Sequence, residues 1–577
     1  MIAVDGARDT QRSSGDRQGT GDGPPHAAPA AAGDPTASWI VWATGLSLAT
    51  VFLKNYWVSE DAYLTFRSVA QLLAGNGPIW NPHERVQVFT SPLWYWLCAL
   101  AQWIVGENYL AILLLSSLTF GAALVLLRRL VHSTLALLGG ALLLVCSSAC
   151  FDYTSAGMEN VLGYALLAAL LHPFFVLTSR GRPPAQVDRS ILTMLACAGL
   201  LLLTRHDLSL LAIPPTLLVC LKHRRAWSTQ RWLATVSLAL VPLLLWSIFA
   251  LVYYGSPLPN TAYAKLSSGF PRSVLLRSGF DYFVVLGRYD IVSLLLLAAA
   301  PVASLLARQR PLQWLSLALV VHCLYVLWVG GDYMQGRFVS FAVLLAIVIL
   351  ARIASQARRG GRAALSLLLL PAAYAVLYPR TPLNTPFDQP KDPAGIRAPG
   401  REYVMDARAT LGHYTSLSSF LTRDRAAAYP RHPLALAGLQ LAASDQNGVV
   451  AHAGGMVGYH AGLSKIVIEA HGIADPLLAR MPASVFAGVG HYIRYRPEGY
   501  IDSLIKPDGA IEDVDLRAYH AKLRLLTESD ELFSAERLKT ILLLNLGVYD
   551  HLRDHFIREK IEGKQQLPDG TKQQAPQ

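Results

Sequence analysis

Residues 110–129 read LAILLLSSLTFGAALVLLRR, an apolar stretch closed by two arginines. About 20 consecutive apolar residues are enough for a helix to cross a bilayer. Comparable stretches recur along the 577 residues, of which 53% are hydrophobic and 15% charged, and the mean hydropathy is +0.34. Because soluble domains carry roughly 25% charged residues, this composition predicts a polytopic α-helical membrane protein. It excludes a disordered chain and a nucleic-acid-binding module.

Eleven membrane spans are predicted from these apolar runs. They cover residues 38–55, 110–127, 133–150, 160–178, 190–204, 208–221, 232–254, 290–307, 312–330, 338–355 and 363–379. The segment 92–105, PLWYWLCALAQWIV, is also apolar. It is short and rich in aromatic residues, so we expect it to lie in the membrane interface.

The basic residues predict the orientation of the spans. With the N-terminus in the cytoplasm, every cytoplasmic loop is basic, as the positive-inside rule requires. The basic loops are 128–129, 180–189, 222–225, 308–310 and 358–362. Counting 92–105 as a further span would put the 128–129 loop on the wrong side. The net charge of +11 fits this bias, and the long C-terminal part is expected outside the membrane.

Four parts follow from this pattern. Residues 1–36 read as a disordered cytoplasmic tail, 37–379 as the transmembrane domain, 380–558 as an outer α/β domain and 559–577 as a second disordered tail. The outer domain opens with a Pro-rich linker, after which we expect a helix within 426–442. Short apolar runs divided by glycines predict strands with tight turns in 447–462 and 465–472.

The cysteines and histidines predict no metal site. All six cysteines lie in apolar stretches and form no CxxC pattern, so neither disulfides nor a zinc site are expected. Four histidines of the outer domain, His452, His460, His471 and His491, have spacings that match no common ligand pattern.

Polar clusters gather in five loops on the outer side of the membrane. They are Glu60–Asp61 with 81–94 in the first outside loop, then 152–160, 204–207, 253–265 and 330–338. Since the topology was assigned from lysine and arginine alone, this convergence predicts a functional site at the outer membrane surface.

The residue types in these loops indicate group transfer from a lipid-linked donor. A transferase on this face needs a donor that crosses the bilayer, and lipid-phosphate-linked sugars meet that need. Such a site needs a carboxylate to act on the acceptor hydroxyl or the sugar carbon. It also needs cations to hold the leaving phosphate. Glu60 and Asp61 are the main carboxylate candidates; the alternative is a pair of surface acids at a helix start, where acids suit the helix dipole.

The remaining candidates are divided by the part of the donor that they would contact. For the donor phosphate and sugar we expect Arg67, Arg205, His206, Asn260, Tyr263, Lys265, Asp332 and Arg337. Further site candidates are Asn81, Glu84, Arg85 and Glu159. Cations at a membrane edge also snorkel to lipid headgroups, and Arg205 and Arg337 have Asp207 and Asp332 close by in sequence as salt-bridge partners.

The ordered set of motifs resembles a known family. EDAYLTFR (60–67), GNGPIWNPHERVQVFTSPLW (75–94), TSAGMEN (154–160), LLLTRHD (201–207), YYGSPLPNTAYAKL (253–266) and VGGDYMQGRF (329–338) are the motifs that carry the likeness. They resemble polyprenyl-phosphate-dependent glycosyltransferases of the GT-C fold, and most nearly the mycobacterial terminal β-(1→2) arabinofuranosyltransferases of cell-wall biosynthesis. HGIADPLLARMP (471–482) and GHYIRYRPEGYIDSL (490–504) extend the likeness into the outer domain.

This resemblance implies transfer of D-arabinofuranose from a decaprenyl-phosphoryl donor to a glycan acceptor, on the outer face of a bacterial cytoplasmic membrane. In that family a paired acidic motif, usually Asp-Asp, opens the first outside loop and carries catalysis. Here the pair is Glu60–Asp61, with Asp61 expected as the catalytic carboxylate and Glu60 as its partner on sugar or acceptor. Some GT-C enzymes hold a divalent cation near the pair, and the sequence leaves that open.

Two other functions remain as alternatives. A transporter or flippase of lipid-linked sugars would show polar or broken helices near the bilayer midplane, often in repeated halves. A non-enzymatic envelope assembly protein would leave the convergence of polar loops without a reason. The charges at one membrane edge and the lack of a visible repeat favour the transferase.

Overall fold

The computed structural model describes residues 35–179, 181–266, 269–356, 360–378, 381–384, 404–405, 407–424, 429–486, 490–506 and 510–562. The two predicted tails and most of the Pro-rich linker lie outside these residues. Described helical residues reach slightly into both predicted tails. Pro35 already begins the first helix, and residues 557–562 continue a helix as a π-helical turn.

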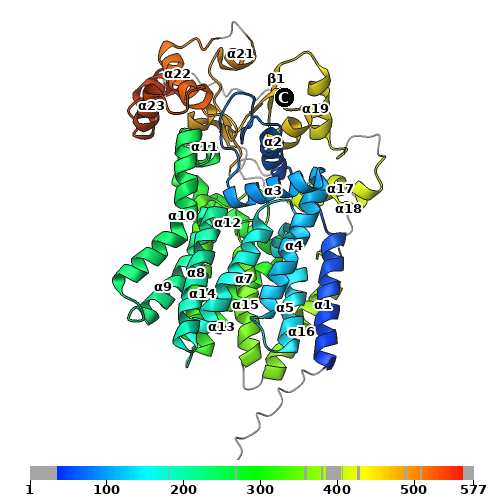
Figure 1. Cartoon of the computed structure of the whole chain (residues 1–577). Coiled ribbons are helices and arrows are strands. Elements are labelled where there is room, and N and C mark those ends of the chain that lie inside the picture. The colour runs from blue at the N-terminus through cyan, green and yellow to red at the C-terminus, as the bar shows by residue number, and fades with distance from the viewer. Residues whose placement is uncertain are drawn as a thin grey trace, which may run out of the picture.

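A bundle of helices forms the larger part of the chain (Figure 1). Its helices are α1 (Pro35–Lys54), α2 (Ala62–Leu73), α3 (Pro92–Val105), α4 (Asn108–Arg128), α5 (Thr134–Cys146), α6 (Ser148–Phe151), α7 (Asn160–Thr178), α8 (Pro184–Thr204), α9 (Ser209–His223), α10 (Thr229–Tyr253), α11 (Asn260–Leu266), α12 (Arg272–Tyr289), α13 (Ile291–Ala307), α14 (Arg310–Val329), α15 (Ser340–Gln356) and α16 (Gly360–Leu377). Short 3₁₀ turns η1 (Asp152–Thr154) and η2 (His206–Leu208) interrupt it.

The bundle is that of a polytopic membrane protein. Five helices, namely α4, α7, α8, α10 and α14, are long and apolar enough to cross a membrane, and up to seven are if each bent pair counts as one span. The bent pairs are α5 with α6–η1, at 82°, and α12 with α13, at 111°. A helix covers each of the eleven predicted segments, but the count of eleven spans stays a prediction.

Two helices at the outer end of the bundle bear on the sequence analysis. Helix α3 lies across this end rather than along the bundle, in line with the interfacial position expected for 92–105 (Figure 1). Helix α12 was not predicted, because its charged residues Arg272, Arg277, Asp281 and Arg288 break the apolar run.

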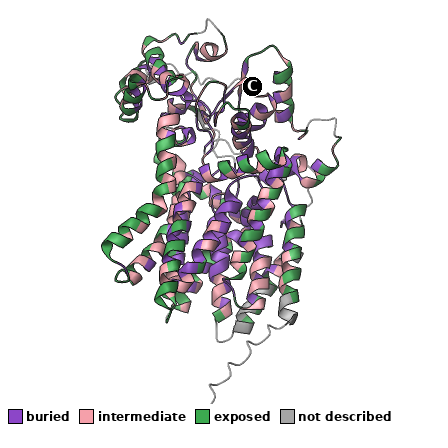
Figure 2. Ribbon diagram, in the orientation of Figure 1, coloured by how far each residue is buried: buried purple, intermediate pink, exposed green. Residues whose placement is uncertain are grey.

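The core of the bundle lies around α7 and α15. Nearly all of α15 from Ser340 to Ile349 is buried, and 67% of the apolar window of α7 is buried, whereas only 6% of that of α10 is. Figure 2 shows this contrast as purple central helices among green outer ones. Apolar side chains on the outer helices are exposed because lipid, not protein, is the solvent there.

The C-terminal region stands beyond the same end of the bundle as α3 (Figure 1). Its helices are α17 (Ala407–Thr415), α18 (Leu417–Leu421), α19 (Pro433–Ala443), α20 (Gly454–His460), α21 (Tyr500–Ile505), α22 (Val514–Glu528), α23 (Ala535–Asn545) and α24 (Asp550–Phe556), with turns η3 (Leu478–Arg480) and η4 (Ile557–Glu562). Strands β1 (Gly448–Ala451) and β2 (Ile466–Glu469) pair in parallel, and β3 (Ala483–Phe486) pairs antiparallel with β4 (Tyr492–Arg494). The helix expected in 426–442 is present as α19. Residues 454–460, expected as strand and turn, instead form α20, the crossover that a parallel pair requires.

Side chains of the first outside loop tie this region to the bundle. The indole of Trp80 is fully buried and donates to the Val467 carbonyl over 2.8 Å, and Asn81 Oδ1 accepts from the Val467 amide over 2.9 Å. Arg537, also fully buried, donates to the carbonyls of Val252 and Tyr253 at the end of α10. The C-terminal region is therefore held against the outer loops of the bundle.

Candidate active site

The acidic pair lies immediately before α2. Asp61 occupies the N-cap position, but its side chain makes no capping hydrogen bond. Instead Oδ1 accepts a 2.9 Å hydrogen bond from the Tyr333 hydroxyl and Oδ2 forms a 2.7 Å ion pair with Arg337. The reading of Glu60 and Asp61 as acids that merely serve the helix start therefore does not hold for Asp61, whose carboxylate points to another loop.

The partner loop, 330–338, is held from several sides. Met405 donates its amide to the Tyr333 carbonyl and accepts from the Gln335 amide, at 2.7 and 3.0 Å. The Tyr153 hydroxyl donates to the Gln335 carbonyl over 2.7 Å. Gly336 has φ +77°, and a Cβ there would lie 2.6 Å from Ala149, so only glycine allows this close approach. These contacts fix the position from which Arg337 reaches Asp61.

Arg337 forms its ion pairs with the described carboxylates through only one of its nitrogens, Nη1. Its Nη1 serves both Asp61 and, over 3.7 Å, the buried carboxylate of Asp332. No hydrogen bond from Nη2 or Nε to a described residue is found. Lys265 lies nearby, with an exposed side chain whose ammonium is 5.8 Å from the Phe338 ring centroid. Two cations thus stand beside Asp61 with donors to spare.

The two acids of the pair sit in opposite electrostatic surroundings. Burial raises the pKa of Asp61, but the charges of Arg337, His491 and Lys265 and the Tyr333 hydrogen bond outweigh it, so the pKa falls below its usual value. For Glu60, burial and then the charge of Asp61 raise the pKa to about 7. Asp61 is held ionised, whereas Glu60 exchanges its proton near neutral pH.

Glu60 faces the C-terminal region. Its Oε1 accepts a 3.0 Å hydrogen bond from the Met456 amide at the start of α20, and the backbone amide of Gly455 also hydrogen-bonds this carboxyl. A Cβ on Gly455 would overlap the Glu60 carbonyl oxygen and lie 2.7 Å from Oε1. Glycine at 455 therefore lets α20 approach the acidic pair.

Arg205 joins the same charged group, but carboxylates already engage all three of its guanidinium nitrogens. Its Nη1 bonds Glu159 over 3.1 Å, and its Nε and Nη2 both bond Asp207 over 2.9 Å. Its guanidinium also lies over the rings of Phe338 and Phe341. The structure thus brings Arg205 and Glu159 to the same charged group, where each of the three guanidinium nitrogens of Arg205 already bonds a carboxylate.

Arg67 and Asn260 are placed elsewhere, which corrects their assignment to the donor site. Arg67 is fully buried and donates to the carbonyls of Trp80, Gly458 and Lys465. The Asn260 amide donates to three carbonyls of the 472–475 turn. Both side chains join the C-terminal region to the bundle, because buried carbonyls need a donor.

Four other predicted residues, Asn81, Glu84, Arg85 and Tyr263, also lie at this junction. Arg85 donates to the carbonyls of Tyr253 and Ser529. Asn81 contacts Glu84 over 3.5 Å, and the Tyr263 hydroxyl accepts from Ser256 over 2.6 Å. His206 has an exposed ring next to Arg205 in sequence.

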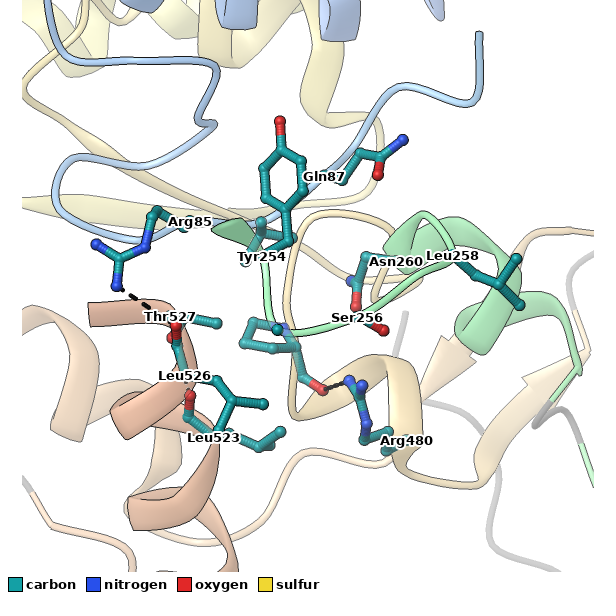
Figure 3. A pocket seen from close by; sticks show the side chains of 13 residues that line it. Arg85, Gln87, Tyr254, Ser256, Leu258, Asn260, Arg480, Leu523, Leu526 and Thr527 are labelled. Carbon is teal, nitrogen blue, oxygen red and sulfur yellow. Dashed lines mark hydrogen bonds between the residues drawn. The ribbon is translucent and has the colours of Figure 1, made fainter. Parts of the chain in front are cut away.

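Arg85 also lines a pocket between the first outside loop, the end of α10, η3 and α22 (Figure 3). Arg85 and Arg480 stand on opposite sides of this pocket (Figure 3). None of Glu60, Asp61, Lys265 and Arg337 lines it. The pocket is therefore separate from the acidic pair.

Sequence reasoning missed two residues at the acidic pair. Tyr333 was inside a quoted motif, yet nothing in the sequence marked its hydroxyl as the partner of Asp61. His491 lies more than 400 positions from Asp61 in the chain and was considered only as a metal ligand. Its ring centroid lies 4.0 Å from that of Tyr333. Only the fold brings these residues together.

The described residues do not offer a metal-binding set at the pair. Among them, no group of three or more His, Cys, Asp or Glu side chains could hold a metal ion. The two oxygens of Asp61 are bonded to Tyr333 and Arg337.

Two curated proteins share sequence with this chain. It is 28% identical over 341 residues to the terminal β-(1→2)-arabinofuranosyltransferase of Mycobacterium tuberculosis, a match covering 52% of this chain and 53% of the relative. It is 26% identical over 338 residues to the protein of the same name from Corynebacterium glutamicum, covering 51% and 48%. The chain thus spans about half the length of the curated relatives it matches. These relatives confirm the resemblance predicted from the motifs.

No family model matches the chain. Among solved structures, ArnT from Cupriavidus metallidurans bound to undecaprenyl phosphate aligns with TM-score 0.43 and 13% identity over 75% of this chain and 86% of ArnT. The Archaeoglobus fulgidus oligosaccharyltransferase aligns with TM-score 0.43 and 12% identity over 74% and 62%.

Proposed function

We propose that this protein is a GT-C-type glycosyltransferase that moves a sugar, D-arabinofuranose, from a polyprenyl-phosphate donor to a cell-surface glycan. The observation that carries the proposal is the acidic pair Glu60–Asp61 beside two incompletely used cations, Arg337 and Lys265, at one end of an apolar bundle. The names of the curated relatives support the reaction and the sugar.

The cations suit the phosphate of such a donor. Phosphate leaves as an anion, and preformed donors at the place where charge develops stabilise that departure most. Arg337 Nη2 and the Lys265 ammonium are the described groups with capacity for it. The exposed apolar side chains of the outer helices offer a wall for the polyprenyl chain.

Asp61 and Glu60 have different roles in the proposed reaction. Asp61, held ionised between Tyr333 and Arg337, positions the guanidinium for phosphate. Glu60, which is half-buried and whose pKa is about 7, takes the proton of the acceptor hydroxyl. As that oxygen bonds to the anomeric carbon, the bond from this carbon to the phosphate oxygen breaks. This division differs from the sequence expectation, which placed catalysis on Asp61.

The predicted membrane topology is part of the same proposal. Eleven spans with the N-terminus in the cytoplasm put residues 60–61, 265 and 337 and the C-terminal region on the outer side of a bacterial cytoplasmic membrane. The transporter alternative calls for charges at the bilayer midplane, whereas Glu60 bonds the Met456 amide of the C-terminal region and Asp61 lies within the charge influence of His491 of that region. The geometry therefore favours transfer over transport.

The experiment that tests this function is transfer by the purified full chain in nanodiscs. Labelled decaprenyl-phosphoryl-arabinofuranose is the donor and a synthetic arabinofuranosyl oligosaccharide the acceptor. Glu60→Gln should lower kcat by about 10²–10⁴-fold, as expected for loss of a general base, with the donor KM unchanged. Asp61→Asn should lower kcat and raise the donor KM together.

The matched control is Glu531→Gln, an exposed acid of the C-terminal region, which should transfer at the wild-type rate. Near-normal transfer by both Glu60→Gln and Asp61→Asn would overturn the assignment of the site. Absence of transfer by the wild type, with this donor and with a panel of other polyprenyl sugars, would overturn the transferase proposal.

A further inference from the structure

We propose that the acceptor glycan binds on a surface of the C-terminal region at a row of three rings, next to Glu60, in which His452 is exposed, His491 half-buried and His471, between them, buried. This inference rests on the proposed function and names the second half of its site. The three rings were considered in the sequence only as metal ligands, and of the three only His491 has a part in the site described above, through its charge on Asp61.

The histidines form a continuous row that ends at the acidic pair. The centroids of the His452 and His471 rings are 6.4 Å apart, and those of His471 and His491 4.7 Å apart. His491 then packs edge to face on Tyr333, 4.0 Å between centroids, and Tyr333 donates to Asp61. A ligand on this row lies beside the carboxylates that act on it.

The topology of the strands places the row at the edge where ligands bind. His452 directly follows β1, and His471 follows β2 by two residues. Parallel strands that share a crossover helix bind ligands outside their carboxyl ends. Here that edge faces the acidic pair, because the Met456 amide at the start of the crossover helix bonds Glu60.

The chemistry of the row fits hydroxyl groups rather than phosphate. A neutral imidazole offers one donor and one acceptor, and burial, then the charges of His491 and His452, lowers the pKa of His471 to about 3. Glu469 is a third carboxyl on this side: burial raises its pKa, and the charges of Glu60 and Asp61 act on it. Carboxyl oxygens accept hydrogen bonds from sugar hydroxyls.

The donor and acceptor halves meet at one loop. Gly490 has φ +79°, and a Cβ there would lie 3.2 Å from Lys265 Cε, while the next residue, His491, packs on Tyr333. The loop thus contacts the cationic half through Gly490 and the carboxylate half through His491. A phosphate at Lys265 and a hydroxyl at the row would approach Glu60 from different sides.

The test separates acceptor binding from turnover. His452→Gln and His491→Gln are made in the full chain, with His551→Gln on α24, also an exposed histidine, as the matched control. Both test variants should raise the acceptor KM about tenfold or more with the donor KM unchanged, and the control should do neither. Because His452 is exposed, its substitution leaves the fold intact.

A second readout needs no transfer. Binding of the arabinofuranosyl oligosaccharide to the Glu60→Gln protein is followed by saturation-transfer NMR, and adding His452→Gln or His491→Gln should abolish the signal. A histidine-dependent signal with no transfer by the wild type would support the surface while overturning the proposed reaction. Unchanged acceptor KM and unchanged NMR signal in both variants would overturn the surface while leaving the reaction in place.

Discussion

Two arginines near the acidic pair, Arg205 and Arg337, each contact two carboxylates, and they differ in which of their nitrogens remain without a carboxylate partner. Arg205 bonds Glu159 and Asp207 through Nε, Nη1 and Nη2. Arg337 meets Asp61 and Asp332 through Nη1 alone. The sequence gives no sign of this difference, since each arginine has an acid close by in its own loop.

The difference teaches how to separate a structural cation from a ligand-binding one. The Arg205 group is closed: its side chain and those of Glu159 and Asp207 are 8 to 10% exposed. In the Arg337 group, Asp61 is 24% exposed, and Lys265 adds a second charge. A buried charge without partners is costly, so open donors persist where a ligand supplies the missing partner.

Arg205→Met gives the largest effect expected from this comparison. It leaves Glu159 and Asp207 buried without a counter-charge, which costs about 3–5 kcal/mol. Thermal unfolding of the detergent-purified protein should show a clear fall in Tm, and Arg189→Met, an exposed arginine on the same helix α8, should show none.

Adding Asp207→Asn to Arg205→Met should restore part of the lost Tm, because one of the two uncompensated charges is removed. A wild-type Tm with failed donor use in Arg205→Met would instead place Arg205 in the phosphate site, as the sequence predicted.

Arg337→Lys should act in the opposite way. The lysine keeps a positive charge beside Asp61 and Asp332 but lacks the second N–H edge of the guanidinium. Loss of a charge-assisted hydrogen bond, about 1.5–3 kcal/mol, should lower kcat/KM for the donor about 10–100-fold while Tm stays near the wild-type value. Donor titrations in the transfer assay measure this; unchanged donor kinetics would remove Arg337 from the phosphate site.

The sequence predicted which loops converge, because hydropathy and the positive-inside bias act on whole segments. Glu60, Asp61, Lys265, Asp332 and Arg337 all came from that convergence, and the structure brings them together.

The sequence could not separate these residues from those at the junction with the C-terminal region. Arg67 and Asn260 lie in the same loops and have the same residue types, yet they bond backbone carbonyls. Whether a donor is used by the backbone depends on contacts hundreds of positions away. For the same reason Tyr333 and His491 had no local signal.

The pH dependence of transfer tests the role of Glu60. Since its pKa is raised to about 7 and the base form is the active one, kcat/KM should rise about tenfold per pH unit below 7 and level off above it.

The stability of the folded protein should fall as the pH rises, whereas the transfer rate should rise. A carboxyl with a raised pKa in the folded state contributes stability that is fully present below its usual pKa of 4.5 and is lost as the pH rises through about 7. Tm should therefore fall between pH 5 and 8, and Glu60→Gln should flatten that slope. A transfer rate that is flat from pH 5 to 8 would contradict the role of Glu60 as base.

Tyr333→Phe is expected to have a smaller effect. It removes one hydrogen bond to Asp61 but keeps the ring that packs on His491. A loss of about 1 kcal/mol corresponds to a roughly fivefold fall in kcat, with the acceptor KM unchanged. A rise in acceptor KM alone would show that the hydroxyl serves the acceptor rather than Asp61.

Chelation is expected to have the smallest effect of all. The Asp61 carboxylate is balanced by Arg337, and Lys265 stands nearby, so the positive charge that a divalent cation would supply to the phosphate is already present. Transfer after dialysis against EDTA should therefore match the untreated protein, and added Mg²⁺, Mn²⁺ or Ca²⁺ should not raise it. Loss of transfer that a single one of these ions restores would mean that Asp61 exchanges Arg337 for a metal when donor binds. The unused donors of Arg337 would then be explained by its release from Asp61 for a metal ion, and not by a phosphate that they bind directly.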